Sequence, residues 1–180
     1  METIPLTNAL AKLAKQLQAA QGFFYVDGKA NAQEIGKSKR EVVFELLSGE
    51  LAGQTVIVWA VFRYDIAQLM TELYPLGATD IVLDFIAGKN RILIANPASG
   101  GYALNLQIAT AQIFLSNTFK YGDRIQAESR SHRMGQAVPV TIIDIIAKGT
   151  LDRHVLNVLN KKATLAEVIK SELGISVNKK

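Results

Sequence analysis

Four runs of the sequence are almost continuously apolar and rich in β-branched residues: TVIVWAVF (55–62), RILIANP (91–97), AQIFLSN (111–117) and VPVTIIDII (138–146). Continuous runs of this length are typical of strands buried on both faces. Between them, apolar positions recur at helical spacing over 63–74, 79–89, 103–109 and 121–133. Strands alternating with helices predict right-handed crossovers and a mainly parallel central sheet with helices on both faces, a three-layer α/β domain.

The first fifty residues predict two helices joined by a short strand or loop. Leucines at helical spacing predict an amphipathic helix over 5–21. The second helix is predicted to open with a capping box from Ser38 to Glu41 and to present Val42 and Leu46 to a core.

The pattern after residue 148 is helical again, where Thr150 can cap one helix and Thr164 begins another. We find no repeat and no low-complexity linker, so we interpret the chain as one domain. Its expected parts are an N-terminal helical lead-in (1–54), an α/β core (55–148) and C-terminal helices with a basic tail (149–180).

The composition excludes several classes of site. The chain has 180 residues, of which 49% are hydrophobic and 20% charged, with no cysteine and only two histidines. Disulfides, a thiol nucleophile and a zinc site built on cysteine are therefore excluded, and a histidine metal cluster is not expected. Neither a secretion signal nor 18 uninterrupted apolar residues is found, so we expect no membrane insertion and a cytoplasmic location.

The net charge of +4 is concentrated in the last part of the chain. Residues 1–147 carry 13 Lys/Arg and 13 Asp/Glu, whereas residues 148–180 carry 7 and 3, which together give the totals of 20 and 16. Basicity of this kind indicates a solvated helix face as readily as a nucleic-acid partner.

The stretch DRIQAESRSHRMGQ (123–136) places Arg130 and Arg133 three positions apart. If the helix continues through them, both guanidinium groups project from nearly one face, where two rigid forks suit the charge of a polyphosphate. The alternative is an exposed helix end paired with Glu128 or Asp123.

Two further polar segments follow predicted strands directly, so we expect these features to gather at one edge of the sheet. Ser-Gly-Gly at 99–101 permits close approach of backbone to a phosphate, although a tight strand-to-helix turn is the commoner explanation of a Gly-Gly pair. After the first strand, Trp59 and Phe62 are interpreted as core. Arg63 begins a helix, where it either pairs with Asp65 or holds a nucleic-acid backbone.

The chain contains no GxxxxGK[ST] phosphate loop and no strand ending in an acidic pair suited to magnesium. Asp144 lies within its predicted strand and is interpreted as structural. By itself this chain is not expected to hydrolyse a nucleotide.

The order of these segments resembles the second RecA-like lobe of the Swi/Snf-type ATPases of helicase superfamily 2, most closely the bacterial and phage branch. The resemblance covers roughly residues 15–170. QAESRSHRMGQ resembles motif VI, SGGYALNL motif V and VIVWAVFR motif IV, and KGTLDRHVLNVLNKK is similar to the stretch that follows motif VI. It implies a RecA-like fold of the P-loop NTPase type.

The resemblance also implies roles. ATP binds between two lobes, and the first lobe, joined in cis or supplied in trans, carries the phosphate loop and the ligands of Mg. Carried over, the arginine fingers are Arg130 and Arg133, and such fingers are worth about a thousandfold or more in rate. The implied nucleotide-binding residues are Gly101, Asn105 and Gln126. The implied contacts to the DNA backbone, which position DNA without reading its sequence, are Arg63, Ser99 and Gly100.

Two departures from the family pattern leave alternatives open. Residues 73–89 are shorter than the corresponding part of the family pattern, by some fifteen residues. The missing part is the segment called motif IVa, which contains one strand and one DNA contact. Ser116 and Phe119 indicate the phage-like branch. A stand-alone lobe acting as a nucleic-acid-binding or protein-interaction module is the main alternative, and a small-molecule enzyme with Asp144 or His132 as base is the third.

Overall fold

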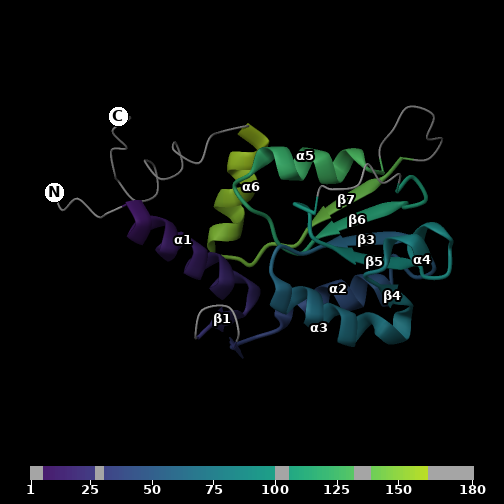
Figure 1. Ribbon diagram of the computed structural model, residues 1–180, viewed down its shortest axis with the longest axis horizontal. Helices are drawn as coiled ribbons and strands as arrows, with labels where there is room; N and C mark the ends of the chain where they lie inside the picture. Colours follow the sequence, from purple (N-terminus) through teal and green to yellow (C-terminus); the bar gives the residue numbers. More distant parts are fainter. Residues whose placement is uncertain (1–5, 27–30, 100–105, 132–138, 162–180) are drawn as a thin grey trace.

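The predicted parallel sheet is confirmed in the computed structural model, which describes residues 6–26, 31–99, 106–131 and 139–161 (Figure 1). Five parallel strands lie side by side in the order β4-β5-β3-β6-β7. Their bounds are β3 Val56–Trp59, β4 Ala78–Thr79, β5 Ile92–Ala95, β6 Ala111–Phe114 and β7 Thr141–Asp144. Together with the surrounding helices they form a RecA-like α/β fold.

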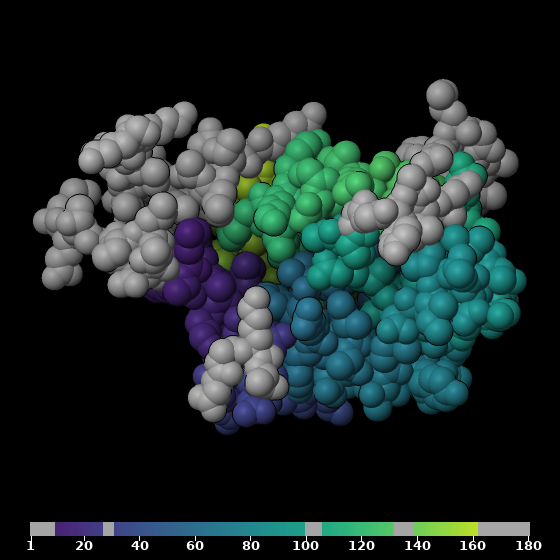
Figure 2. Space-filling view, in the orientation of Figure 1, coloured from purple at the N-terminus to yellow at the C-terminus, as the bar shows by residue number. Residues whose placement is uncertain are grey.

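Helices cover both faces of this sheet. In Figure 1, α2 and α3 lie below the strands and α5 lies above them, and the space-filling view shows the same layers in blue and green (Figure 2). Helix α1 packs against α6, and a hairpin of β1 and β2 follows α1 in the sequence. The bounds are α1 Leu6–Gln21, β1 Phe23–Tyr25, β2 Ala32–Glu34, α2 Ser38–Ser48, α3 Arg63–Leu73, α4 Val82–Ile86, α5 Tyr121–Ser129 and α6 Leu151–Lys161.

The core is divided by the sheet into two clusters, because successive residues of a strand point to opposite faces. Val56 and Val58 of β3 pack with Ile113 against residues of α2 and α3. Ile57 and Trp59 face the other side, where the cluster includes Phe85, Leu93, Phe114 and Ala127. Every residue of β3 is fully buried, as the continuous apolar run predicted.

The last strand departs from this pattern. β7 pairs only with β6 in the described sheet and forms its edge, so Ile142 remains 43% exposed. The prediction that this strand is buried on both faces is therefore wrong.

The start of α2 also differs from prediction. Lys37 is the N-cap, its side chain makes no capping hydrogen bond, and Glu41 pairs with Lys37 at 3.4 Å. Leu46 packs against the core as expected, together with its buried neighbours Val43 and Leu47, whereas Val42 is 41% exposed. The capping box is thus wrong, and the helix begins one residue before the position assumed for it.

A strand expected to be missing is present in short form. The 3-10 turn Tyr74–Leu76 ends at Gly77, whose φ of 83° lies in the left-handed region that glycine adopts without strain. The chain then enters β4, whose two residues pair in parallel with β5. The shortened sequence reduces this edge to two residues but does not remove it.

Two other helix predictions have mixed outcomes. Only Val82–Ile86 of the range 79–89 is helical, and in 106–109, the described part of 103–109, the chain makes a turn without a helix. Thr150 does cap α6, because its Oγ1 accepts a hydrogen bond from the Asp152 backbone N–H at 3.3 Å. Thr164 lies outside the described residues. Within the described chain, no helix is both long enough and apolar enough to cross a bilayer.

Candidate functional site

The loops at the carboxyl ends of the central strands are tied together by side chains. Asn96, after β5, donates its side-chain N–H to the Val61 carbonyl at 2.9 Å, and the Val61 backbone N–H donates to Ser116 Oγ at 2.8 Å. Because Val61 follows β3 and Ser116 follows β6, these two bonds fix three strand ends to one another. Ser116 therefore has a structural task at this edge.

Arg63 is the first residue of α3 at the same edge, and it is exposed. Its predicted pairing with Asp65 is wrong. Asp65 is fully buried, and neither of its carboxyl oxygens has a hydrogen-bond partner in the described structure. Burial raises the pKa of Asp65 to about 7.

The backbone of Arg130 follows α5 over one face of the sheet. α5 joins the parallel strands β6 and β7, so it must run back from the end of β6 towards the start of β7, and it ends at Ser129 with Arg130 as its C-cap. The guanidinium of Arg130 nevertheless reaches the carboxyl ends of the strands, since it lies over Trp59, the last residue of β3, and bonds to Ser99 in the loop after β5. Arg130 and Ser99 thus lie together, as expected.

The Arg130 side chain is only 6% exposed and rests on aromatic and backbone groups. Its guanidinium carbon lies 5.5 Å from the centre of the Trp59 ring, and its Nη2 donates to the Ser99 carbonyl at 3.2 Å. Its own carbonyl accepts a hydrogen bond from the Leu106 backbone N–H at 3.0 Å. The predicted pairing of this arginine with Glu128 or Asp123 is not formed, since Glu128 binds Arg124 instead.

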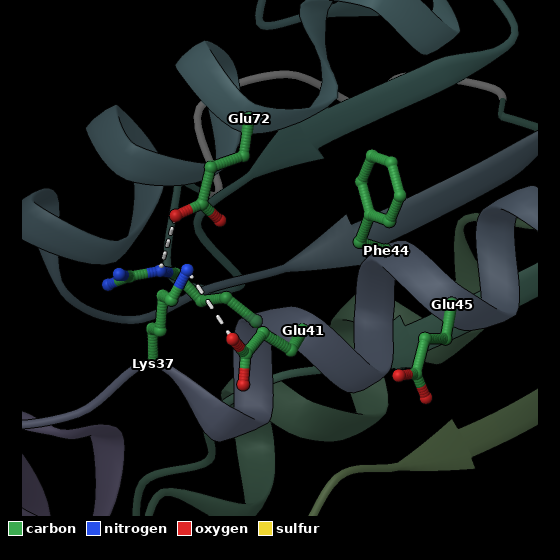
Figure 3. Close-up of a pocket in the computed structure, with 6 residues that line it drawn as sticks. Lys37, Glu41, Phe44, Glu45 and Glu72 are labelled. Atoms are coloured by element: carbon green, nitrogen blue, oxygen red, sulfur yellow. Dashed lines mark hydrogen bonds and ion pairs between the residues drawn. The ribbon is translucent and has the colours of Figure 1, made fainter.

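Two other buried arginines show what a structural arginine looks like in this fold. Arg40 joins Glu34 and Glu72, and Arg124 joins Glu128 at 2.5 Å and Asp144 at 3.0 Å. Arg40 lines a hollow of about 390 Å³ beside α2, where Figure 3 marks its bond to Glu72 and the neighbouring pair of Lys37 and Glu41. Each of these two guanidinium groups is thus balanced by two carboxylates.

The pKa values follow the same division. Burial disfavours the charged form of all three arginines, but hydrogen bonds to carboxylates more than offset it at two of them and raise the pKa of Arg40 and of Arg124. Burial alone lowers the pKa of Arg130, and no carboxylate of the described residues opposes it. Arg130 is therefore a buried cation that is not neutralised within the described part of the chain.

The other predicted site residues are distributed unevenly. Gln126 is exposed on α5, and its backbone carbonyl accepts a bond from Ser129 Oγ at 2.9 Å. Ser99 is exposed and its Oγ donates to the Asn96 carbonyl at 2.5 Å, while its own carbonyl meets Arg130. Outside the described residues lie Arg133, Gly100, Gly101, Asn105 and His132. The structure brings Ser99 and Arg130 together, whereas Arg63 begins α3, which packs on the opposite face of the sheet from Arg130.

Sequence reasoning missed Gln112 and Arg124. Gln112 is a fully buried amide within β6, and Arg124 stacks on Phe114 with its guanidinium carbon 3.6 Å from the ring centre. The available signal was Gln112, a polar residue among the apolar residues of 111–115, since a buried amide requires partners. Asp144, interpreted as structural, is the last residue of β7 and accepts bonds from Arg124 and from Asn117.

Comparison with known proteins gives matches over much or part of the chain. It is 32% identical over 177 residues to protein p41 of Acyrthosiphon pisum secondary endosymbiont phage 1, which covers 92% of this chain and 38% of the phage protein. It is 34% identical over 86 residues to the ATP-dependent helicase fft1 of Schizosaccharomyces pombe, covering 47% of this chain and 9% of that protein. No protein-family model matches the chain.

A solved structure shares the fold. The C-terminal part of the Fun30 ATPase domain superposes with a TM-score of 0.60 at 22% identity, over 84% of this chain and 57% of that one. The chain spans well under two thirds of the phage protein and of fft1.

Proposed function

We propose, from the premise that this chain is related to the Swi/Snf-type ATPases of helicase superfamily 2, that it is the second RecA-like lobe of an ATP-dependent DNA translocase or helicase. In this function the chain supplies Arg130 and Arg133 to the γ-phosphate of an ATP held, with its Mg, by a first lobe. Gly101, Asn105 and Gln126 contact the nucleotide, and Arg63, Ser99 and Gly100 contact the DNA backbone.

One observation supports this proposal most directly: Arg130 is buried without a carboxylate partner among the described residues, unlike Arg40 and Arg124. A buried cation is costly unless an anion accompanies it. Among the described residues, its guanidinium is held by a carbonyl and by an aromatic ring, and a phosphate oxygen is a stronger acceptor than a neutral carbonyl. The group is thus suited to an anion brought by another molecule.

The test combines this chain with a first lobe that carries a phosphate loop, both mixed in trans and fused ahead of residue 1. We expect DNA-stimulated ATP hydrolysis, and a loss of about a thousandfold in kcat on Arg130→Ala or Arg133→Ala. Arg153→Ala, an exposed change on α6, serves as the matched control and keeps the activity. If neither the mixture nor the fusion hydrolyses ATP faster than the first lobe alone, the proposal is wrong.

The second candidate is a stand-alone lobe that binds nucleic acid or protein without ATPase activity. It is favoured by the two-residue strand β4, where the family pattern has a longer segment. Salt-dependent binding of the chain to duplex DNA that is unchanged by both arginine substitutions, together with inactive lobe combinations, would support it. Absence of DNA binding at low salt would leave only a protein-interaction role.

A further inference from the structure

Gln112 is a polar residue in the centre of a buried strand, and all of its polar side-chain atoms are bonded. Its Oε1 accepts the Trp59 indole N–H at 2.7 Å, and its Nε2 donates to the Glu128 carbonyl at 3.1 Å and to Ser131 Oγ. A buried amide without such partners destabilises a fold, so this arrangement is specific to its neighbours. The amide therefore joins β3, β6 and the end of α5.

The amide nitrogen of Gln112 bonds to Glu128 and Ser131, which lie on either side of Arg130 in the sequence. Glu128 lies two positions before it, and Ser131 directly follows it. Ser131 Oγ also donates to the Glu128 carbonyl at 3.4 Å, which completes a closed set of bonds around the helix end. The last carbonyls of a helix have no partner within the helix, and here a side chain from the sheet supplies one.

The side chain of Arg130 is held by the same group indirectly. Its guanidinium rests on the Trp59 ring, and the orientation of that ring is fixed by the indole hydrogen bond to Gln112. One amide thus determines both the backbone that carries Arg130 and the surface on which its guanidinium lies.

We infer that Gln112 and Trp59 are positioning residues for Arg130: they act on catalysis through the arginine and do not touch the nucleotide. The positioning is a property of this chain alone, whereas its effect on ATP hydrolysis rests on the proposed function. An arginine that acts on the transition state must be held in advance, because a small displacement removes much of its effect.

The first test measures the position of Arg130 without any ATPase assay. Phenylglyoxal modifies accessible guanidinium groups, and fragment mass spectrometry gives the rate for each arginine of the intact chain. We expect Gln112→Met, which keeps the volume and removes all three bonds, to accelerate modification of Arg130 about tenfold while Arg40 reacts as in the wild type. Ser131→Ala, a milder variant that removes one arm, should give a smaller increase.

The matched control is Ile113→Val, which loosens the same strand on the opposite face of the sheet. Modification of Arg130 should stay at the wild-type rate in this variant. Unchanged modification of Arg130 in both Gln112→Met and Ser131→Ala overturns the inference, and so does an equal acceleration in Ile113→Val.

The second test uses the two-lobe ATPase. Gln112→Met should lower kcat about tenfold with an unchanged KM for ATP, since Arg130 acts in the transition state, and Ile113→Val should change neither. A raised KM with unchanged kcat would overturn a positioning role in catalysis. If the wild-type assembly is inactive, the proposed function fails, and the modification rates still decide whether Gln112 positions Arg130.

Discussion

The carboxyl group of Asp65 is buried and has no hydrogen-bond partner among the described residues. Burial raises its pKa from 3.8 to about 7, while the nearby charges of Arg40 and Lys39 lower it and those of Asp152 and Glu72 raise it. Because the pKa of Asp65 is higher in the folded than in the unfolded state, its contribution to the free energy of unfolding is largest below about pH 4, where the carboxyl is protonated in both states. This contribution is lost as the pH rises to about 7.

We therefore expect Asp65→Asn to change how stability depends on pH. Between pH 5 and pH 8 the wild-type chain should lose on the order of 2 kcal/mol in its free energy of unfolding relative to the variant, because only the wild type must ionise a buried group. Urea unfolding of both chains at the two pH values measures this difference.

The control for this prediction is Asp80→Asn, a change at an exposed aspartate after β4. Its unfolding free energy should follow that of the wild type across the same pH range. Parallel curves for Asp65→Asn and the wild type would show that the Asp65 carboxyl is solvated by groups or water that offset its burial.

The environment of a single residue could be predicted from the sequence where residues close to it along the chain determine that environment. Trp59 in the core was expected, whereas the helix expected to run to residue 133 ends at Ser129 and Arg130 is buried. The partners of Gln112 lie 53, 16 and 19 positions away, and no local pattern contains that information. The predicted pairing of Arg63 with Asp65 failed for a related reason: the second side chain turns into the core, where α2 and α6 supply the nearby charges.

The start of α6 joins elements that are far apart in the sequence. Asp152 is 7% exposed, and its carboxylate accepts bonds from Lys39 Nζ of α2 at 2.8 Å, from Gln21 Nε2 of α1 at 3.4 Å and from the Ala147 backbone N–H at 3.0 Å. Breaking a buried ion pair from one side leaves an uncompensated charge. This carboxylate thus links α1 and α2 to the start of α6.

We expect Asp152→Ala to destabilise the chain by about 3–5 kcal/mol, and Lys39→Met combined with it to recover part of that loss. The measurement is a double-mutant cycle by urea unfolding. Lys37 and Glu41 form an exposed pair on the same helix, with side chains 58% and 53% accessible, and breaking it should cost less than about 1 kcal/mol. Strictly additive changes at Lys39 and Asp152 would mean that the ion pair contributes nothing.

The elements themselves were largely predictable, because the apolar period decides between strand and helix. All four long strands and the helices α1, α2, α3, α5 and α6 occur where the pattern placed them. The exposure of β7 and the presence of β4 could not be predicted, since both depend on the order of strands in the sheet. A position at the edge is a property of the assembled sheet and leaves no mark on the period.

In the whole molecule, Arg63 and Arg130 belong to different surfaces. Arg63 begins α3, a helix that packs on the face of the sheet opposite to the one that carries Arg130 and Trp59. Arg63 is also exposed at a helix N-terminus, where backbone N–H groups favour phosphate. If the proposed function is right, the DNA contact of Arg63 and the nucleotide contact of Arg130 lie on separate surfaces and can be removed independently, whereas Ser99 lies beside Arg130.

This separation predicts opposite results for two single substitutions. Arg63→Ala should weaken binding of the chain to short duplexes of any sequence by a similar factor and reduce the slope of log affinity against log salt by about 1, because one phosphate contact is lost. Arg130→Ala should leave affinity and slope unchanged, since its fork faces the Ser99 carbonyl. Fluorescence anisotropy over a salt series measures both. A reduced slope for Arg130→Ala would assign this buried cation to DNA and would remove the reason for treating it as an arginine finger.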